Sequence, residues 1–292
     1  MKNQPLAEVF GFPTANVSRQ AERYRTLKLC PYNNKVPNCT KDKASDPLGV
    51  CSIYHDKEAV ITCPIRFRQD WIIAEDAARF FFDKGTSWTS LTEVRLKDKH
   101  GQSAGNIDVV LVAYDDRGRV VDFGSLEVQA VYISGNVRKP FEYYMGDRKA
   151  RKEMDWSKLA DYYPRANFLS SSRKRLVPQL LYKGSILHGW KKKQAVGIQG
   201  CFYDTLPDLP AVDPEEAEIA WFLYELQPGS NRFDLTLSRT VYTKFWPALN
   251  TITTPDAGAI EDFIEVLQQK LDEKRNGNPP DAPLITDIPL YE

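Results

Sequence analysis

The sequence predicts an α/β protein with a mixed central β-sheet flanked by helices, preceded by a small N-terminal module that contains four clustered cysteines. Apolar, β-branched runs alternate with amphipathic segments over residues 70–292, as in α/β domains. Four of the five cysteines fall between residues 30 and 63, and no internal repeat or low-complexity tract is present. We therefore expect two parts, residues 1–69 and residues 70–292.

The N-terminal part begins with a short helix predicted around residues 16–25. The following segment is rich in Pro, Asn, Asp and Gly, which is typical of loops. The cysteine spacings are C-x8-C, C-x11-C and C-x11-C, without the C-x2-C pairs of zinc ribbons. Because residues 31–49 include few apolar side chains, a structural metal ion is the expected source of order. The expected ligands are Cys30, Cys39, Cys51 and Cys63.

The identity of the metal ion stays open, because four thiolate ligands suit zinc and iron about equally. His55 lies within the segment as a possible substitute ligand. The alternative is that the four cysteines are reduced and simply packed among apolar groups. Cys201, far along the chain, is expected to be a buried residue of a strand.

A helix over residues 71–84 is predicted next, with Asp70 as its cap and Gly85 as its end. Its expected apolar side consists of Trp71, Ala74, Ala78 and Phe81. Apolar, β-branched runs then predict strands at residues 90–96, 106–114 and 120–133. The sequence DDRG at residues 115–118 is typical of a tight turn. These segments therefore form neighbouring antiparallel strands.

Helices are predicted at residues 139–156 and 176–190, with Pro178 near the start of the second, where a missing N–H is tolerated. Further strands are expected at residues 195–203, 219–226 and 233–243. An amphipathic helix over residues 259–275, ending at Gly277, and an extended Pro-rich tail complete the prediction.

Two strands of the predicted sheet carry polar groups among apolar neighbours. Asp108 lies in one strand, and Glu127 and Gln129 point to the same side of the next. Carboxylates on adjacent strands, with the Val128 carbonyl, could hold Mg²⁺ through oxygen ligands. The alternative is an ordinary solvated sheet face, although the apolar residues on both sides indicate strands that are largely covered.

An Asp on one strand, a short hairpin and then Glu-x-Lys on the next strand are the signature of the PD-(D/E)XK nuclease fold. The segments IDVVLVAY and LEVQAVYI resemble it, except that Gln129 stands at the Lys position. A neutral amide can hydrogen-bond a water molecule but cannot offset charge. The metal ion would then be left to lower the pKa of the attacking water.

Together with the cysteine segment and EVRL, these motifs make residues 25–200 resemble the NotI family of type II restriction endonucleases, which also tolerates Gln at this position. The resemblance implies that Asp108 and Glu127 bind metal, that Glu93 completes the site and that Gln129 positions water or metal. It also implies a single structural iron at the cysteines. The expected activity is magnesium-dependent double-strand cleavage of a GC-rich DNA palindrome by a homodimer.

The net charge of zero is the sum of a strongly basic region and an acidic region. Residues 138–193 include 15 Lys and Arg against 5 Asp and Glu, whereas the chain after Thr254 has 9 acidic and 3 basic residues. The basic region is either a DNA-binding surface or an ordinary solvated one. Within it, three basic residues follow three serines at a predicted helix start. Outside it, two arginines and a glutamine that follow Cys63 are candidates for base contacts. The candidates are Arg173, Lys174, Arg175, Arg66, Arg68 and Gln69.

Two other functions remain open: a nonspecific repair-type nuclease of the same fold, and an inactive or regulatory DNA-binding protein with a structural metal. The sequence has no G-x-S-x-G motif and no Gly-rich phosphate loop, which argues against serine hydrolases and nucleotide hydrolases. No apolar run approaches the roughly 20 residues that span a bilayer. A cytoplasmic protein without membrane contact is therefore expected.

Overall fold

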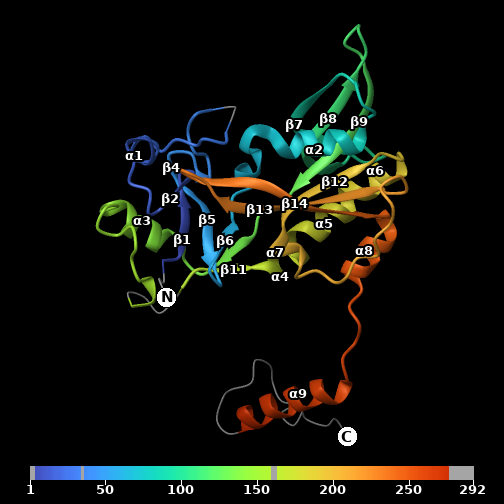
Figure 1. Ribbon diagram of the computed structural model, residues 1–292. Helices are drawn as coiled ribbons and strands as arrows, with labels where there is room; N and C mark the ends of the chain where they lie inside the picture. Colours follow the sequence, from blue (N-terminus) through green and yellow to red (C-terminus); the bar gives the residue numbers. More distant parts are fainter. Residues whose placement is uncertain (1–3, 34–35, 159–162, 276–292) are drawn as a thin grey trace, which may run out of the picture. The chain divides into compact units, whose positions relative to one another are not determined.

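The computed structural model describes residues 4–33, 36–158 and 163–275. A six-stranded mixed sheet forms its centre, in the order β14-β13-β12-β9-β8-β7 (Figure 1). Strand β12 pairs parallel with both β9 and β13, and the other pairs are antiparallel. The predicted mixed α/β architecture is thereby confirmed. The strands are β7 (Trp88–Lys97), β8 (Ser103–Tyr114), β9 (Val120–Val128), β12 (Gln194–Gln199), β13 (Ile219–Pro228) and β14 (Phe233–Thr243).

Helix α2 (Ile72–Phe81) covers one face of this sheet, where Phe81 packs among Leu111 and Leu126. The ring approaches the sheet closely at Gly124, because a Cβ there would lie 2.4 Å from Cδ2 of Phe81. A long helical stretch over residues 168–189, with α7 (Gly200–Tyr203) and α8 (Phe245–Thr253), contributes to the core on the other face. Helix α8 was not predicted from the sequence.

The N-terminal region forms a second sheet, which corrects the prediction of loops. Its strand order is β2-β1-β5-β6, and all three pairs are antiparallel. Short strands and a turn at Asp56 and Lys57, both with positive φ, hide the period-two pattern that would have indicated it. The elements here are β1 (Leu6–Val9), β2 (Phe12–Pro13), α1 (Arg19–Thr26), β3 (Asp42–Lys43), β4 (Asp46–Pro47), β5 (Val50–His55) and β6 (Glu58–Ile61). Helix α3 (Arg138–Gly146), from later in the chain, shares a hydrophobic core with them.

The entrance to α2 differs from the prediction. A 3-10 helix, η1 (Pro64–Trp71), precedes it, and Asp70 and Trp71 have φ values of 52° and 54°. In this left-handed backbone Asp70 does not cap α2, whose first residue follows Trp71 without a side-chain cap. Predicted strand 120–133 is also interrupted, because β9 ends at Val128 and Tyr132–Ser134 forms a separate strand, β10, that pairs with β11 (Arg165–Asn167).

The helical stretch over residues 168–189 alternates between α- and π-helical turns. Pro178 lies in its middle rather than near its start, so that prediction was wrong. Proline interrupts the normal hydrogen-bond ladder, and wider π turns stand on both sides of it. The segments are α4 (Phe168–Ser171), η3 (Ser172–Leu176), α5 (Val177–Gln179), η4 (Leu180–Gly184) and α6 (Ser185–Gly189).

Two further predictions concern the second half of the chain. The strand predicted at 195–203 ends at Gln199, so Cys201 lies on the short helix α7 and is half-buried rather than part of a strand. The helical segment predicted at 139–156 is shorter, because α3 ends at Gly146; a single 3-10 turn, η2 (Trp156–Lys158), follows it.

The chain divides into two compact units, residues 1–253 and 254–292. The second contains the predicted amphipathic helix, α9 (Ile260–Arg275), whose apolar side chains such as Phe263 and Leu267 are exposed. Its predicted end at Gly277 and the Pro-rich tail lie outside the described residues. The boundary expected between residues 69 and 70 stays a prediction. No described helix is both long and apolar enough to cross a membrane.

Candidate active site

Adjacent strands bring Asp108 and Glu127 together, as the sequence predicted. Val109 on β8 pairs with Leu126 on β9, so the two carboxylates occupy neighbouring positions of the sheet. Asp108 Oδ2 accepts a 2.9 Å hydrogen bond from the backbone N–H of Val128, and the two carboxyl groups are close enough for each to shift the pKa of the other. The result is a close pair of carboxylates at the end of β9.

Lys183, on η4, lies against this pair and was not identified from the sequence. Its Nζ donates to Glu127 Oε2 at 2.6 Å and to the carbonyl oxygen of Asn106 at 2.8 Å, and the residue is only 4% exposed. Helical spacing carries a signal for it, because Lys183 falls on the same side as the buried residues Leu180 and Leu187. A lysine on the apolar side of a helix requires a buried acidic partner.

The carboxylates have shifted pKa values. The pKa of Glu127 is raised to about 8, chiefly by burial and then by the neighbouring Asp108 carboxylate, with Lys183 opposing both effects. Burial also raises the pKa of Asp108, against the Val128 N–H and Lys183, which lower it. Glu127 Oε1 is buried and has no hydrogen-bond partner among the described residues. An unpartnered, buried carboxylate oxygen beside a second carboxylate fits a hard divalent cation, which satisfies such oxygens by coordination.

Glu93 and Gln129 border this pair. Glu93 is exposed on β7 with φ 57°, and it falls opposite Asp108 in the register, where its charge raises the pKa of Asp108. Gln129 follows β9; its side-chain amide donates to the carbonyl of Ala130, so its own Oε1 is left to accept from another donor. In the described chain, no group of three or more His, Cys, Asp or Glu side chains stands in metal-binding geometry. The centre is therefore a carboxylate pair with Glu93 nearby.

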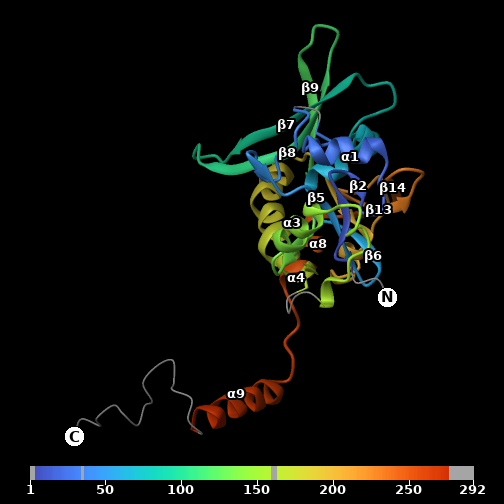
Figure 2. The same cartoon turned by 90° about the vertical axis from the view of Figure 1, so that its left-hand side faces the viewer.

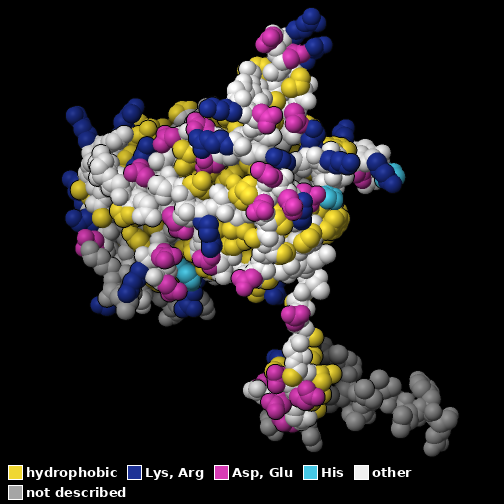
Figure 3. Space-filling model, turned by 45° about the vertical axis from the view of Figure 1, so that its right-hand side comes forward, with side chains coloured by type: hydrophobic (Ala, Val, Ile, Leu, Met, Phe, Trp, Pro, Cys, Tyr) yellow, Lys and Arg dark blue, Asp and Glu magenta, His cyan; other side chains and the backbone are white. Residues whose placement is uncertain are grey.

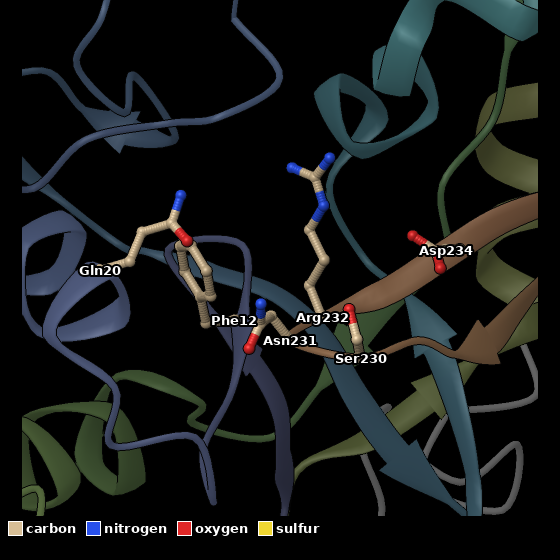
Figure 4. A pocket seen from close by; sticks show the side chains of 6 residues that line it. All are labelled: Phe12, Gln20, Ser230, Asn231, Arg232 and Asp234. Atoms are coloured by element: carbon tan, nitrogen blue, oxygen red, sulfur yellow. The ribbon is translucent and has the colours of Figure 1, made fainter.

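A hollow of about 800 Å³ opens beside Asp108. Asp108, Val128 and Gln129 line it together with Arg175 and Gln179 from the helical stretch. The guanidinium of Arg175 lies 4.8 Å from the ring centre of Tyr132. This cation–π contact keeps the positive charge of Arg175 at the edge of the hollow. A second hollow, of about 320 Å³, contains none of the predicted site residues (Figure 4). Its lining residues are Phe12, Gln20, Ser230, Asn231, Arg232 and Asp234.

The predicted DNA-contacting residues fall into two groups. Arg173, Lys174 and Arg175 are exposed on η3, and Arg175 reaches the hollow. The residues after Cys63 lie differently, because Arg66 and Gln69 are buried and hydrogen-bonded to each other at 2.7 Å.

Arg66 is the more deeply engaged of the two. It is fully buried, and its Nε donates to Glu8 at 3.1 Å. Arg68 is half-buried beside Trp71, with its guanidinium 5.6 Å from the ring centre. These contacts give Arg66 and Gln69 partners inside the protein, and base contact by any of the three stays a prediction.

The four clustered cysteines are free of disulfides, and all but the half-buried Cys30 are buried. The pKa of Cys30 is raised to about 11, chiefly by burial, with Cys63 and Cys39 contributing to the increase. Burial likewise raises the pKa of Cys51, with Glu8 and the other three thiols adding to the effect. The four thiols therefore lie within electrostatic range of one another. His55 instead packs edge-on against Phe168, at 5.4 Å between ring centres.

Comparison with known proteins bears on this arrangement. The search of curated proteins finds no match. The family described as "Restriction endonuclease NotI" matches residues 15–237, which include the four cysteines, the carboxylate pair and Lys183. Because this match covers most of the chain, the protein belongs to the NotI family of restriction endonucleases, which are site-specific deoxyribonucleases.

Proposed function

We propose that this protein is a type II restriction endonuclease that makes Mg²⁺-dependent double-strand breaks at a GC-rich palindromic DNA site, with a PD-(D/E)XK-type centre. The observation that carries the proposal is the buried pair of Asp108 and Glu127, with its unpartnered Oε1 atom, beside a hollow lined by Arg175. The family supplies the reaction, which is hydrolysis of a phosphodiester.

In this mechanism Asp108, Glu127 and the Val128 carbonyl would hold Mg²⁺, which supplies Lewis acidity and an acidic bound water. Lys183 fixes the orientation of Glu127 and contributes the positive charge that Gln129 lacks. Gln129 has a free side-chain oxygen with which to orient the attacking water. Glu93, from the exposed strand opposite Asp108, would complete the site.

The test is digestion of a large viral DNA with Mg²⁺, followed by sequencing of the fragment ends. Asp108→Asn and Glu127→Gln should abolish cleavage while duplex binding, measured by mobility shift, persists; Asp116→Asn, on an exposed turn, serves as the control. Discrete fragments with common ends support restriction. A smear would instead support the nonspecific nuclease, and binding without cutting would support the regulatory protein.

We also propose that Cys30, Cys39, Cys51 and Cys63 bind a structural iron or zinc ion. The supporting observation is the donor chemistry, because the four thiols lie close enough to shift one another's pKa values, and thiols lose their protons when they bind a metal ion. The described side chains do not themselves stand in metal-binding geometry, so binding would require them to reorient. Elemental analysis of protein purified without added metal should give about one ion per chain. The Cys39→Ser variant should lose it, and metal-free wild-type protein would contradict the proposal.

A double-strand break at a symmetric site requires two centres related by a two-fold axis. We therefore propose that the active form is a homodimer bound to double-stranded DNA. Sedimentation equilibrium of the protein with and without a cleavable duplex measures this directly. Cleavage of both strands in one encounter by a species of monomer mass would contradict it.

A further inference from the structure

The paired ends of β7 and β8 beyond Glu93 and Asp108 form a projecting hairpin, residues 93–108, which we call the arm. Figure 2 shows these two strands extending away from the rest of the sheet. The turn is closed by Asp98, whose carboxylate accepts from the backbone N–H groups of His100 and Gln102 at 2.8 and 2.9 Å. The arm is thus a closed hairpin with an ordered tip.

One side of the arm is fixed to the helix behind it. Leu96 and Ile107 are buried against Leu187 of α6. Lys183, which bonds Glu127, also donates to the Asn106 carbonyl at 2.8 Å, so one side chain joins the arm backbone to the carboxylate pair. The arm is therefore held in position relative to the site, and its exposed side chains are partly pre-organised.

The other side of the arm is basic. Arg95 and Lys97 on β7 and Lys99 in the turn are all exposed, and none of them forms an ion pair with another described residue. In Figure 3, Lys and Arg side chains gather on the projection at the right, which is the arm. The hairpin between β8 and β9 differs, because Arg119 there is paired with Asp115 at 2.6 Å.

The register places these cations beside the site. Arg95 pairs with Asn106, and this pair follows Glu93 and Asp108 by two residues along the hairpin. Two residues of a strand span about 7 Å, and four span about 13 Å. At a rise of about 3.4 Å per nucleotide, Arg95 and Lys97 fall roughly two and four nucleotides from a phosphate held at Asp108.

We propose that the arm binds the backbone of duplex DNA beside the cleaved phosphodiester, with Arg95 and Lys97 as phosphate ligands and Lys99 as a further cation. This rests on the proposed nuclease function, because it assumes that the reacting phosphate lies at Asp108. Charge complementarity selects a polyanion, and the fixed attachment through Lys183 keeps the cations in register with the carboxylates. Contacts to phosphate position the duplex and do not depend on sequence.

The test compares wild-type protein, Arg95→Ala/Lys97→Ala and the control Arg117→Ala, which removes an exposed cation at the opposite end of β8. Equilibrium binding to a fluorescent 30-base-pair duplex, without metal, is measured from 50 to 200 mM salt. The slope of log affinity against log salt should fall by about 2 for the double variant and remain unchanged for the control. Circular dichroism verifies that the exposed substitutions leave the fold intact.

Single-turnover cleavage of viral DNA at saturating enzyme provides a second measurement. The double variant should cut at the same positions but need a higher enzyme concentration to reach saturation, because the lost contacts position the duplex and do not read its sequence; Arg117→Ala should saturate like wild type. An unchanged salt slope for the double variant would overturn the arm proposal, even if wild-type protein cuts DNA. Absence of cutting by wild-type protein would overturn the proposed function, while the salt slope still decides whether the arm binds DNA.

Discussion

Replacing Arg66 tests whether this residue stabilises the fold or contacts DNA. Arg66 and Glu8 are both fully buried, and the guanidinium also donates to Gln69 at 2.7 Å and to the carbonyl of Phe233 at 2.8 Å. It lies 4.4 Å from the ring centre of Tyr32. The change Arg66→Met keeps much of the volume and removes all of these polar contacts.

The loss of stability in Arg66→Met follows from Glu8, which remains buried without its ion-pair partner. After Arg66→Met, the Glu8 carboxylate keeps a 2.8 Å bond from Ser52 Oγ but loses its counter-charge in a fully buried position. Breaking a buried ion pair from one side costs about 3–5 kcal/mol, whereas replacing both members with apolar groups is often nearly neutral. We therefore expect Arg66→Met to lower the free energy of unfolding by that amount, and Glu8→Leu/Arg66→Met to recover most of it.

Urea unfolding at 25 °C, followed by tryptophan fluorescence and far-ultraviolet circular dichroism, measures both changes. Arg68→Met, on the half-buried neighbour, is the control and should change stability by less than about 1 kcal/mol. The reasoning is refuted if Arg66→Met also costs less than 1 kcal/mol, or if the double variant is no more stable than the single one. If the folded double variant cuts DNA at new positions, Arg66 contacts bases after all.

Three further predictions concern the site and the sheet beneath it. Because the pKa of Glu127 is raised to about 8, the carboxylate pair keeps a proton below that pH, and Mg²⁺ must displace this proton to bind. The cleavage rate at subsaturating Mg²⁺ should therefore rise about tenfold per pH unit from pH 6 to pH 8 and then level off. A rate that does not change with pH would contradict this prediction. Lys183→Met should lower the single-turnover cleavage rate on the order of 100-fold, with duplex affinity nearly unchanged, whereas an equal loss of both would indicate misfolding. Gly124→Ala would place a Cβ 2.4 Å from the Phe81 ring and should cost about 1–3 kcal/mol in urea unfolding, unlike Gly189→Ala, which has open space around it.

The sequence predicted the carboxylate strands because their signal is local. In β8 and β9, apolar residues and a tight turn from Asp115 to Gly118 mark both strands and their pairing within one continuous segment, residues 103–128. Alternation then places Glu127 on one face without further information. The same local signals indicated β13, β14 and α9 correctly.

The features that were missed depend on contacts distant in sequence. Arg66 resembles a surface residue until its partner Glu8, 58 residues earlier, is known. Lys183 was counted only as one of the many positive charges of residues 138–193. Its acidic partner, Glu127, lies 56 residues earlier, so the sequence does not show that the two side chains pair. The N-terminal sheet was missed because strands of four to six residues leave too short a pattern to distinguish from loops.

The parallel pairing of β12 with β9 has a consequence for the order in which the protein folds. The hairpins from β7 to β9 are contiguous and need only local closure, whereas Gln194 pairs with Ser125 across 69 residues. Lys183 lies inside that crossover, so the chain can bring its two carboxylates together before their counter-ion arrives. Because the chain is synthesised from its N-terminus, both carboxylates precede the segment that neutralises them, and we expect docking of the lysine-bearing helix to be a late step of folding.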